Sequence, residues 1–189
     1  GHVAARDGGE VNLLTAAELA KMPGESVDLV IADPPYAFEG WDDLLGRISA
    51  DDVVAMQLPN WKEFLILHLA ATRLGIVSCL ITPMSRDREL VHMLNLSDAR
   101  VLVIPDSYRN HDYRAMVARV RGEVPTLQQV IVVGETANSH EVGWPDFLAA
   151  ADTRHDFAAL KPHANDVTEI VFTSGATGEP KGVMHTSNT

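Results

Sequence analysis

Near its carboxyl end the sequence reads Asp166-Val-Thr-Glu-Ile-Val-Phe-Thr-Ser-Gly-Ala-Thr-Gly-Glu-Pro-Lys-Gly-Val183. The apolar, partly β-branched run from Ile170 to Phe172 predicts a buried strand. It leads directly into a loop, Thr173 to Gly182, that is rich in hydroxyls and glycines. Glycines let backbone N–H groups turn toward a ligand, hydroxyls add donors, and Lys181 supplies a positive charge. Together these groups are typical of a polyphosphate site.

The loop differs from the two common nucleotide-binding motifs. A P-loop has Gly-Lys-Ser/Thr starting five residues after its first glycine, whereas Pro180 stands at that place here. The sequence also contains no G-x-G-x-x-G pattern. The alternative to a phosphate site is a solvent-exposed turn of glycines and threonines, which the loop alone does not exclude.

Upstream of the loop, short runs of Val, Ile and Leu alternate with helical patterns. Such alternation predicts an α/β fold, a doubly wound and mainly parallel sheet with helices on both faces, here as an incomplete domain. The polar segment from Gly134 to Gly143 is expected to be a surface loop. We expect strands at 27–32, 53–58, 76–81, 100–104 and 130–133, and helices at 60–74, 86–96, 113–121 and 144–149.

The helix that begins near Asn60 has identifiable ends. Asn60 is expected to be the N-cap, because Glu63 follows three residues later. Gly75 is expected to end the helix. Its apolar residues lie almost all around the helix, which predicts a buried helix.

Composition limits the classes of function. The chain has 189 residues and a net charge of −11, which argues against a broad nucleic-acid surface. A single cysteine, Cys79, can form no internal disulfide, and we expect it to be a buried thiol in a reducing compartment. The start Gly1 to Arg6 shows no signal-peptide core, and no apolar run approaches about 18 residues. We therefore expect a cytoplasmic protein without a membrane span; the oligomeric state is not predicted.

The terminal loop resembles the signature loop of the adenylate-forming (AMP-dependent) superfamily, which includes acyl-CoA synthetases and ligases. The family pattern is Thr-Ser-Gly-Thr-Thr-Gly-x-Pro-Lys-Gly, and Ala176 is the one departure from it. The segments Val53-Val-Ala-Met-Gln-Leu-Pro-Asn-Trp61, Arg73-Leu-Gly75 and Ala99-Arg-Val-Leu-Val103 also fall in the order and spacing of that family's amino-terminal domain. Within the family, the likeness is to bacterial acyl- or aryl-acid–CoA ligases, including those of fatty acid metabolism.

This resemblance implies an activity and a set of ligands. Family members bind ATP with Mg²⁺, activate a small carboxylic acid as acyl-AMP, and pass the acyl group to coenzyme A. No metal site other than the Mg²⁺ carried by ATP is expected. The residues that would bind the phosphates are Thr173, Ser174, Gly175, Ala176, Thr177, Gly178, Lys181 and Gly182.

The same resemblance limits what the chain is expected to do alone. The family's acid pocket, adenine-binding segment, ribose-contacting aspartate and mobile carboxy-terminal domain with its catalytic lysine lie downstream of the loop. We therefore expect weak or absent ATP binding and no acyl-AMP formation by this chain. Detectable pyrophosphate exchange would contradict that expectation.

A second signature, Asp33-Pro-Pro-Tyr36, follows the strand expected at 27–32. An acidic side chain and a proline-fixed carbonyl can accept both hydrogens of an exocyclic amino group, and an aromatic ring can stack on its base. This stretch resembles the catalytic strand end of amino-methyltransferases that methylate guanine N2 in ribosomal RNA. The alternative function is then that of an S-adenosylmethionine-dependent remnant acting on nucleic acid, with the residues Asp33, Pro34, Pro35 and Tyr36. The plain alternative is a strand end followed by a Pro-Pro turn.

The two resemblances divide the chain near Ala50. Residues 1–49 would be the methyltransferase-like segment, and residues 50–189 the truncated amino-terminal part of the AMP-binding synthetase domain. The hypothesis is that two genes are joined here or that the chain is truncated. A third interpretation is a non-catalytic α/β module.

Single histidines and one tryptophan complete the candidate residues. His68 and His92 are expected to be structural, and no pair of histidines has metal-ligand spacing. His185 matches a histidine often found at that place in the family. Trp61 is expected to be a core aromatic at a helix start rather than a pocket wall.

Overall fold

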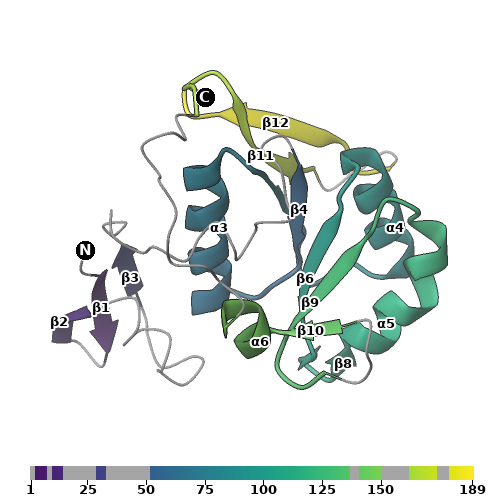
Figure 1. Cartoon of the computed structure of the whole chain (residues 1–189), viewed down its shortest axis with the longest axis horizontal. Helices are drawn as coiled ribbons and strands as arrows, with labels where there is room; N and C mark the ends of the chain where they lie inside the picture. Colours follow the sequence, from purple (N-terminus) through teal and green to yellow (C-terminus); the bar gives the residue numbers. More distant parts are fainter. Residues whose placement is uncertain are drawn as a thin grey trace.

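A seven-stranded sheet in the order β10-β9-β6-β4-β5-β11-β12 forms the centre of the structure, a computed structural model (Figure 1). The structure describes residues 3–7, 10–14, 29–32, 52–136, 141–149, 162–173 and 179–189. In this sheet β12 pairs antiparallel with β11, and the other neighbours pair in parallel. The predicted mainly parallel α/β fold is confirmed. The strands are β4 (Val53–Met56), β5 (Val77–Leu80), β6 (Val101–Pro105), β9 (Gln129–Val133), β10 (Glu141–Gly143), β11 (Val167–Phe172) and β12 (Gly182–Thr186).

The chain winds outward from β4 in both directions. It passes through α3 (Lys62–Leu74) to β5 on one side and then through α4 (Asp87–Ser97) to β6 on the other. It continues through α5 (Tyr113–Val120) and the short helix η1 (Arg121–Glu123) to β9. Parallel neighbours need such crossovers, because a tight turn joins only antiparallel strands. As a result, the carboxyl ends of β4, β5, β6 and β11 lie at one edge of the sheet.

The two faces of the sheet bury separate apolar clusters. Successive strand residues point to opposite faces, so Val54 and Met56 face α3 and α6 (Trp144–Ala149), whereas Ala55 faces α4 and α5. Burying one such large side chain contributes about 1.5–3 kcal/mol. The helices contribute Leu67, Ala70, Ala71 and Leu74 to one cluster, and Leu90, Met93, Leu94, Met116, Val117 and Val120 to the other.

The N-cap of helix α3 lies one residue later than predicted. Its N-cap is Trp61, which makes no side-chain capping bond, so the prediction that Asn60 caps the helix is wrong. The Trp61 carbonyl accepts the first helical bond, from Leu65 N, and this places Asn60 outside the helix. The predicted end at Gly75 is confirmed: its φ of 74° is left-handed, and its N–H bonds back to the last turn. Residues of α3 are buried or half-buried.

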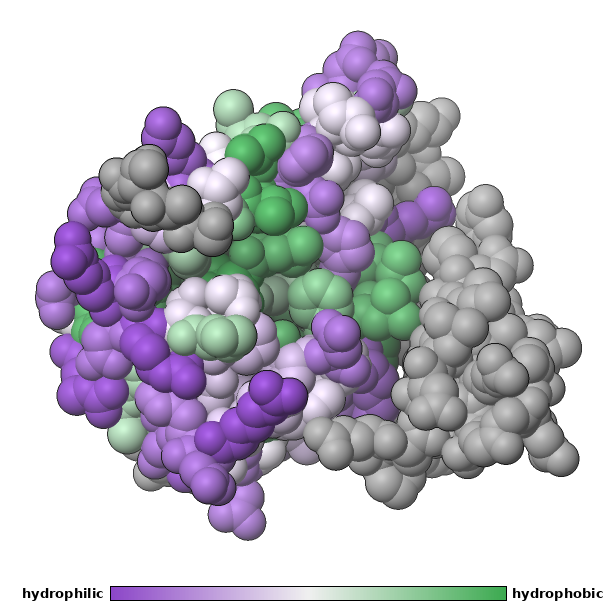
Figure 2. Space-filling model, turned by 180° about the vertical axis from the view of Figure 1, so that it is seen from behind, coloured by the Kyte–Doolittle hydropathy of each residue, from purple (hydrophilic) through white to green (hydrophobic). Residues whose placement is uncertain are grey.

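The edges of the sheet differ from prediction. Residues 141–143, predicted as loop, form β10 and pair in parallel with β9. The prediction that Ile170–Phe172 is a buried strand is wrong about burial, because all of β11 is half-buried. Its outer neighbour β12 was not predicted, and Val183 and Met184 there are 42% and 67% exposed. Figure 2 shows further apolar side chains near the centre of the rear face, with hydrophilic ones along its left side.

Three strands before residue 33 form a separate antiparallel sheet in the order β2-β1-β3. The strand predicted at 27–32 is present as β3 (Leu29–Ala32), paired with β1 (Val3–Asp7). The pairing of β1 with β2 (Glu10–Leu14) was not predicted. A signal for it existed, since Gly8-Gly9 between the paired Asp7 and Glu10 is a typical two-residue hairpin connection.

Replacing Gly134 by alanine is expected to destabilise the fold by about 1–3 kcal/mol. Gly134 has a φ of 128°, and a Cβ there would overlap with the Asp106 carboxyl group. That carboxylate accepts a hydrogen bond from Glu135 N at 3.1 Å. It therefore cannot move away from the new Cβ without losing this bond. The midpoint of urea unfolding measures the effect. The control is Gly122→Ala, where no atom lies within 4 Å of the new Cβ. Equal midpoints for the two variants would contradict the strain argument.

Cys79 is expected to be unreactive in the native protein. Burial raises the pKa of the Cys79 thiol to about 11, so the nucleophilic thiolate is scarce at pH 8. Alkylation by iodoacetamide at that pH should be roughly a hundredfold slower in the native state than in urea. Mass spectrometry of timed samples gives both rates. Similar rates in the two states would mean that β5 opens readily and that the thiol is not held in the core.

Candidate functional site

The predicted phosphate loop leaves the sheet between β11 and β12. Phe172 pairs with Gly182, and the hairpin is extended by Thr173 N, which donates to the Lys181 carbonyl at 3.0 Å. In return Lys181 N donates to Thr173 Oγ1 at 3.3 Å. Two hydrogen bonds therefore fix Thr173 and Lys181 side by side where β11 ends, at the carboxyl edge of the parallel strands.

Gly182 has a packing reason to be glycine. A Cβ at this position would lie 3.1 Å from Ile170 Cγ2 and 3.5 Å from Phe172 Cε1. The absence of a side chain lets β12 approach β11 closely, just after the loop. The hairpin that presents Lys181 is therefore held by close packing as well as by hydrogen bonds.

The loop base, which consists of Thr173 and Lys181, has one cation and one hydroxyl that are available to a ligand. Thr173 and Lys181 are exposed, and in the described ranges the Lys181 ammonium has no carboxylate partner. Thr173 Oγ1 accepts from Lys181 N and keeps its own proton to donate. This part of the loop can therefore bind an anion through a charge and a hydroxyl donor.

Among the described residues, Glu179 contacts α4 and makes no ion pair with Lys181. Its carboxylate lies 3.6 Å from Arg88 Nη2 and 3.5 Å from His92 Nδ1. His92 Nε2 lies 2.8 Å from the Pro180 carbonyl. The sequence assigned His92 only a structural role, and no signal in it links α4 to a residue 88 positions later. This cluster beside the candidate site is the part that sequence reasoning missed.

Two further predicted residues have clear positions. Trp61 is half-buried, packs against the cluster on the α3 face, and meets Tyr108 edge to face at 5.9 Å, as expected for a core aromatic. His185 lies on β12 opposite Glu169, and its Nδ1 is 3.4 Å from Thr189 Oγ1. In the part of the chain that the structure describes, no three His, Cys, Asp or Glu side chains gather as a metal site.

The remaining predicted site residues lie outside the described residues, and their roles stay predictions. In the phosphate loop these are Ser174, Gly175, Ala176, Thr177 and Gly178. In the methyltransferase-like segment they are Asp33, Pro34, Pro35 and Tyr36.

Comparison with known sequences gives consistent matches. The family model described as AMP-binding enzyme matches residues 44–189, which begins six positions before the predicted division near Ala50. The chain is 32% identical over 142 residues to a medium-chain fatty-acid–CoA ligase of Escherichia coli K12, covering 75% of this chain and 25% of that protein. It is 33% identical over 190 residues to a 2-hydroxy-7-methoxy-5-methyl-1-naphthoate–CoA ligase of Streptomyces carzinostaticus, covering 91% and 34%.

A 2,3-dihydroxybenzoate-AMP ligase of Bacillus subtilis 168 is 27% identical over 173 residues, covering 86% of this chain and 31% of the relative. The chain thus spans about a quarter to a third of the length of these relatives.

A solved structure supports the fold. An anthranilate CoA ligase in complex with anthranoyl-AMP matches with a TM-score of 0.73 at 20% identity, covering 93% of this chain and 30% of that one. The relatives named above are acyl- or aryl-acid ligases, as the terminal loop predicted. The chain belongs to the AMP-binding enzyme family of adenylate-forming ligases.

Proposed function

We propose that this chain forms the phosphate-binding part of an ATP-dependent acyl- or aryl-acid–CoA ligase. The observation that carries the proposal is the base of the loop. There the Thr173 hydroxyl and the Lys181 ammonium, which has no carboxylate partner among the described residues, lie where β11 ends. In doubly wound sheets, ligands bind just outside the carboxyl ends of the strands. The loop base lies at this edge of the sheet.

The groups present fit a polyphosphate. A phosphate chain needs hydrogen-bond donors and positive charge, and the loop base offers a hydroxyl and a lysine in solvent contact. Mg²⁺ is proposed to enter with the nucleotide, as ATP usually carries it. The proposed set is completed by Ser174, Gly175, Ala176, Thr177, Gly178 and Gly182.

The chain's residues would hold and orient the leaving group. ATP, when bound, supplies the α-phosphoryl group that the carboxylate attacks and the pyrophosphate that departs. Lys181 would offset the negative charge of the β- and γ-phosphates, and Thr173 would donate a hydrogen bond to a phosphate oxygen. Because two hydrogen bonds already fix Thr173 to Lys181, these groups need little reorganisation when the nucleotide binds.

The proposed substrate is a small carboxylic acid, with coenzyme A as the acyl acceptor. The named relatives act on a fatty acid, a dihydroxybenzoate and a naphthoate, so the proposal does not extend to one acid. The described ranges contain no helix that could cross a membrane. The cytoplasmic location stays a prediction.

Because the chain covers only part of each relative, we propose that it does not complete the reaction alone. The methyltransferase alternative has no support in the described residues, since Asp33 to Tyr36 lie outside them. The adenylate-forming ligase is therefore the one function proposed.

Mg-ATP is expected to bind weakly, with a dissociation constant on the order of 1 mM. A titration followed by ¹⁵N–¹H NMR should shift the amide signals of Thr173, Lys181 and Gly182. The Lys181→Gln variant should weaken binding about five- to tenfold, because it removes a charge-assisted contact to phosphate. The control is Arg121→Gln, which removes the same charge at the end of α5, where the guanidinium contacts only Gln128 O among the described residues.

Two results would contradict this proposal. One is the absence of shifts at the loop base at about 10 mM Mg-ATP, a concentration that detects even very weak binding. The other is an equal loss of affinity in both variants, which would indicate a general charge effect. Isotope exchange between pyrophosphate and ATP should be undetectable, and its detection would overturn the proposal that the chain is inactive alone.

A further inference from the structure

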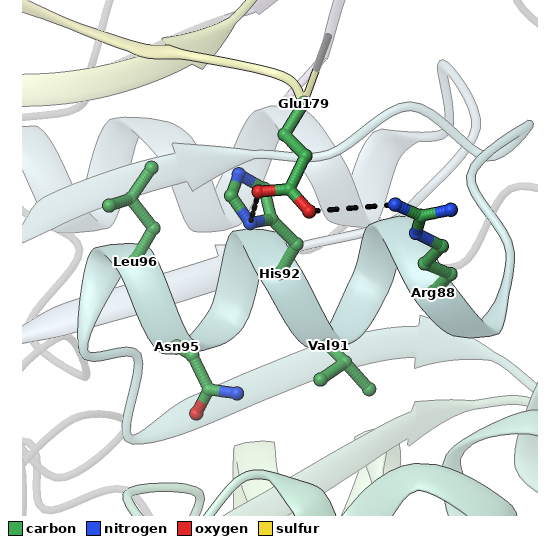
Figure 3. A pocket seen from close by; sticks show the side chains of 6 residues that line it. All are labelled: Arg88, Val91, His92, Asn95, Leu96 and Glu179. Carbon is green, nitrogen blue, oxygen red and sulfur yellow. Dashed lines mark ion pairs between the residues drawn. The ribbon is translucent and has the colours of Figure 1, made fainter.

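An open groove of about 510 Å³ lies along α4, where Glu179 of the phosphate loop meets the helix. Figure 3 shows Glu179 entering this groove from the loop, with its carboxylate between the side chains of His92 and Arg88. These two residues lie one helical turn apart on α4, so they present their side chains on one face of the helix. Val91, Asn95 and Leu96 line the rest of the groove.

The contact between His92 and Pro180 is the stronger part of this cluster. The distance from Nε2 to the carbonyl oxygen is 2.8 Å, and the His92 side chain is 25% exposed. A carbonyl can only accept, so Nε2 carries the proton in this arrangement. A short, partly shielded hydrogen bond of this kind is worth roughly a three- to tenfold change in an equilibrium constant. It fixes the residue immediately before Lys181.

The contacts of Glu179 affect the charge around Lys181 more than they affect the stability of the fold. Arg88 and Glu179 are 85% and 62% exposed and lie 3.6 Å apart, and exposed pairs of this kind contribute little to folding. Glu179 lies two residues before Lys181, however, where a free carboxylate would repel phosphate and compete for the ammonium. Arg88 offers a permanent positive charge, and His92 Nδ1 adds an ion pair when the ring is protonated.

We propose that His92 and Arg88 are positioning residues for the phosphate loop. His92 anchors Pro180 and thereby the pairing of Lys181 with Thr173. Arg88 holds the Glu179 carboxylate on α4, joined by His92 when its ring is protonated, which leaves Lys181 free for an anion. The anchoring of Pro180 by His92 is argued from the contacts alone. The effect on phosphate binding rests on the proposed function.

Amide hydrogen exchange without nucleotide tests the anchoring. Thr173 N is protected by the Lys181 carbonyl, so loss of the Pro180 anchor should speed its exchange. We expect His92→Ala to speed exchange at Thr173 about three- to tenfold, and His92→Gln, which keeps a donor able to reach Pro180, to restore most of the protection. The control is Asn95→Ala, which removes one hydrogen bond of the same helix, to Glu123 O, away from the loop.

Mg-ATP titration tests the role of charge. Arg88→Gln should weaken binding about two- to fivefold in the natural background, because Glu179 is then less well neutralised. In a Glu179→Gln background the same Arg88→Gln change should have no effect, because no carboxylate remains to be held. This double-mutant cycle separates the proposal from a direct contact of Arg88 with phosphate, which would persist in both backgrounds.

The outcomes separate this inference from the proposed function. If ATP fails to bind but His92→Ala still speeds exchange at Thr173, the function fails and the anchoring stands. Unchanged exchange at Thr173 in His92→Ala, with ATP bound normally, overturns the anchoring and leaves the function intact. If His92→Ala does not fold, His92→Leu, which fills similar space without a donor for the Pro180 carbonyl, replaces it in the exchange experiment. An equal effect of Arg88→Gln in both backgrounds overturns the charge role.

Discussion

Parallel pairing of β4 with β5 and β6 is the constraint on which the rest of the structure depends. It demands a helical crossover for each connection, and the crossovers then supply the apolar cover that a two-sided sheet needs. It also brings the ends of strands from distant parts of the sequence to one edge. The loop after β11 lies at this edge for the same reason, because β11 pairs in parallel with β5.

Most of the sheet could be predicted because its strands carry their signal locally. The strand β6 is buried at every position and follows from an unbroken apolar run. Gly75 marks the end of α3 because a left-handed residue there costs glycine little. In β6 and at Gly75, local chemistry and the final structure agree. Thr173 and Lys181 were proposed as site residues from residue type and order alone, and their role stays a prediction.

The features that could not be predicted depend on contacts that no local sequence pattern indicates. The strand β12 is defined by its pairing with β11, and its sequence, which begins with a glycine and ends in polar residues, has no apolar run. Asn60 has good capping chemistry, but the chain entering α3 makes Trp61 the first helical acceptor instead. The contact between His92 and Pro180 joins two segments that meet only after the sheet has formed. The proposed supporting residues on α4 could not be predicted for this reason.

The order of strands also has a consequence for how the protein folds. From β4 to β10 the sheet is built from consecutive segments, whereas β11 must return from the end of that run to pair with β5. Closing so long a loop costs entropy that is recovered only when the strand docks. During synthesis β11 and β12 also emerge after the strands from β4 to β10. The loop between β11 and β12 therefore acquires its position only after the strands from β4 to β10 have been made, and binding of the proposed nucleotide would report whether β11 has docked on β5.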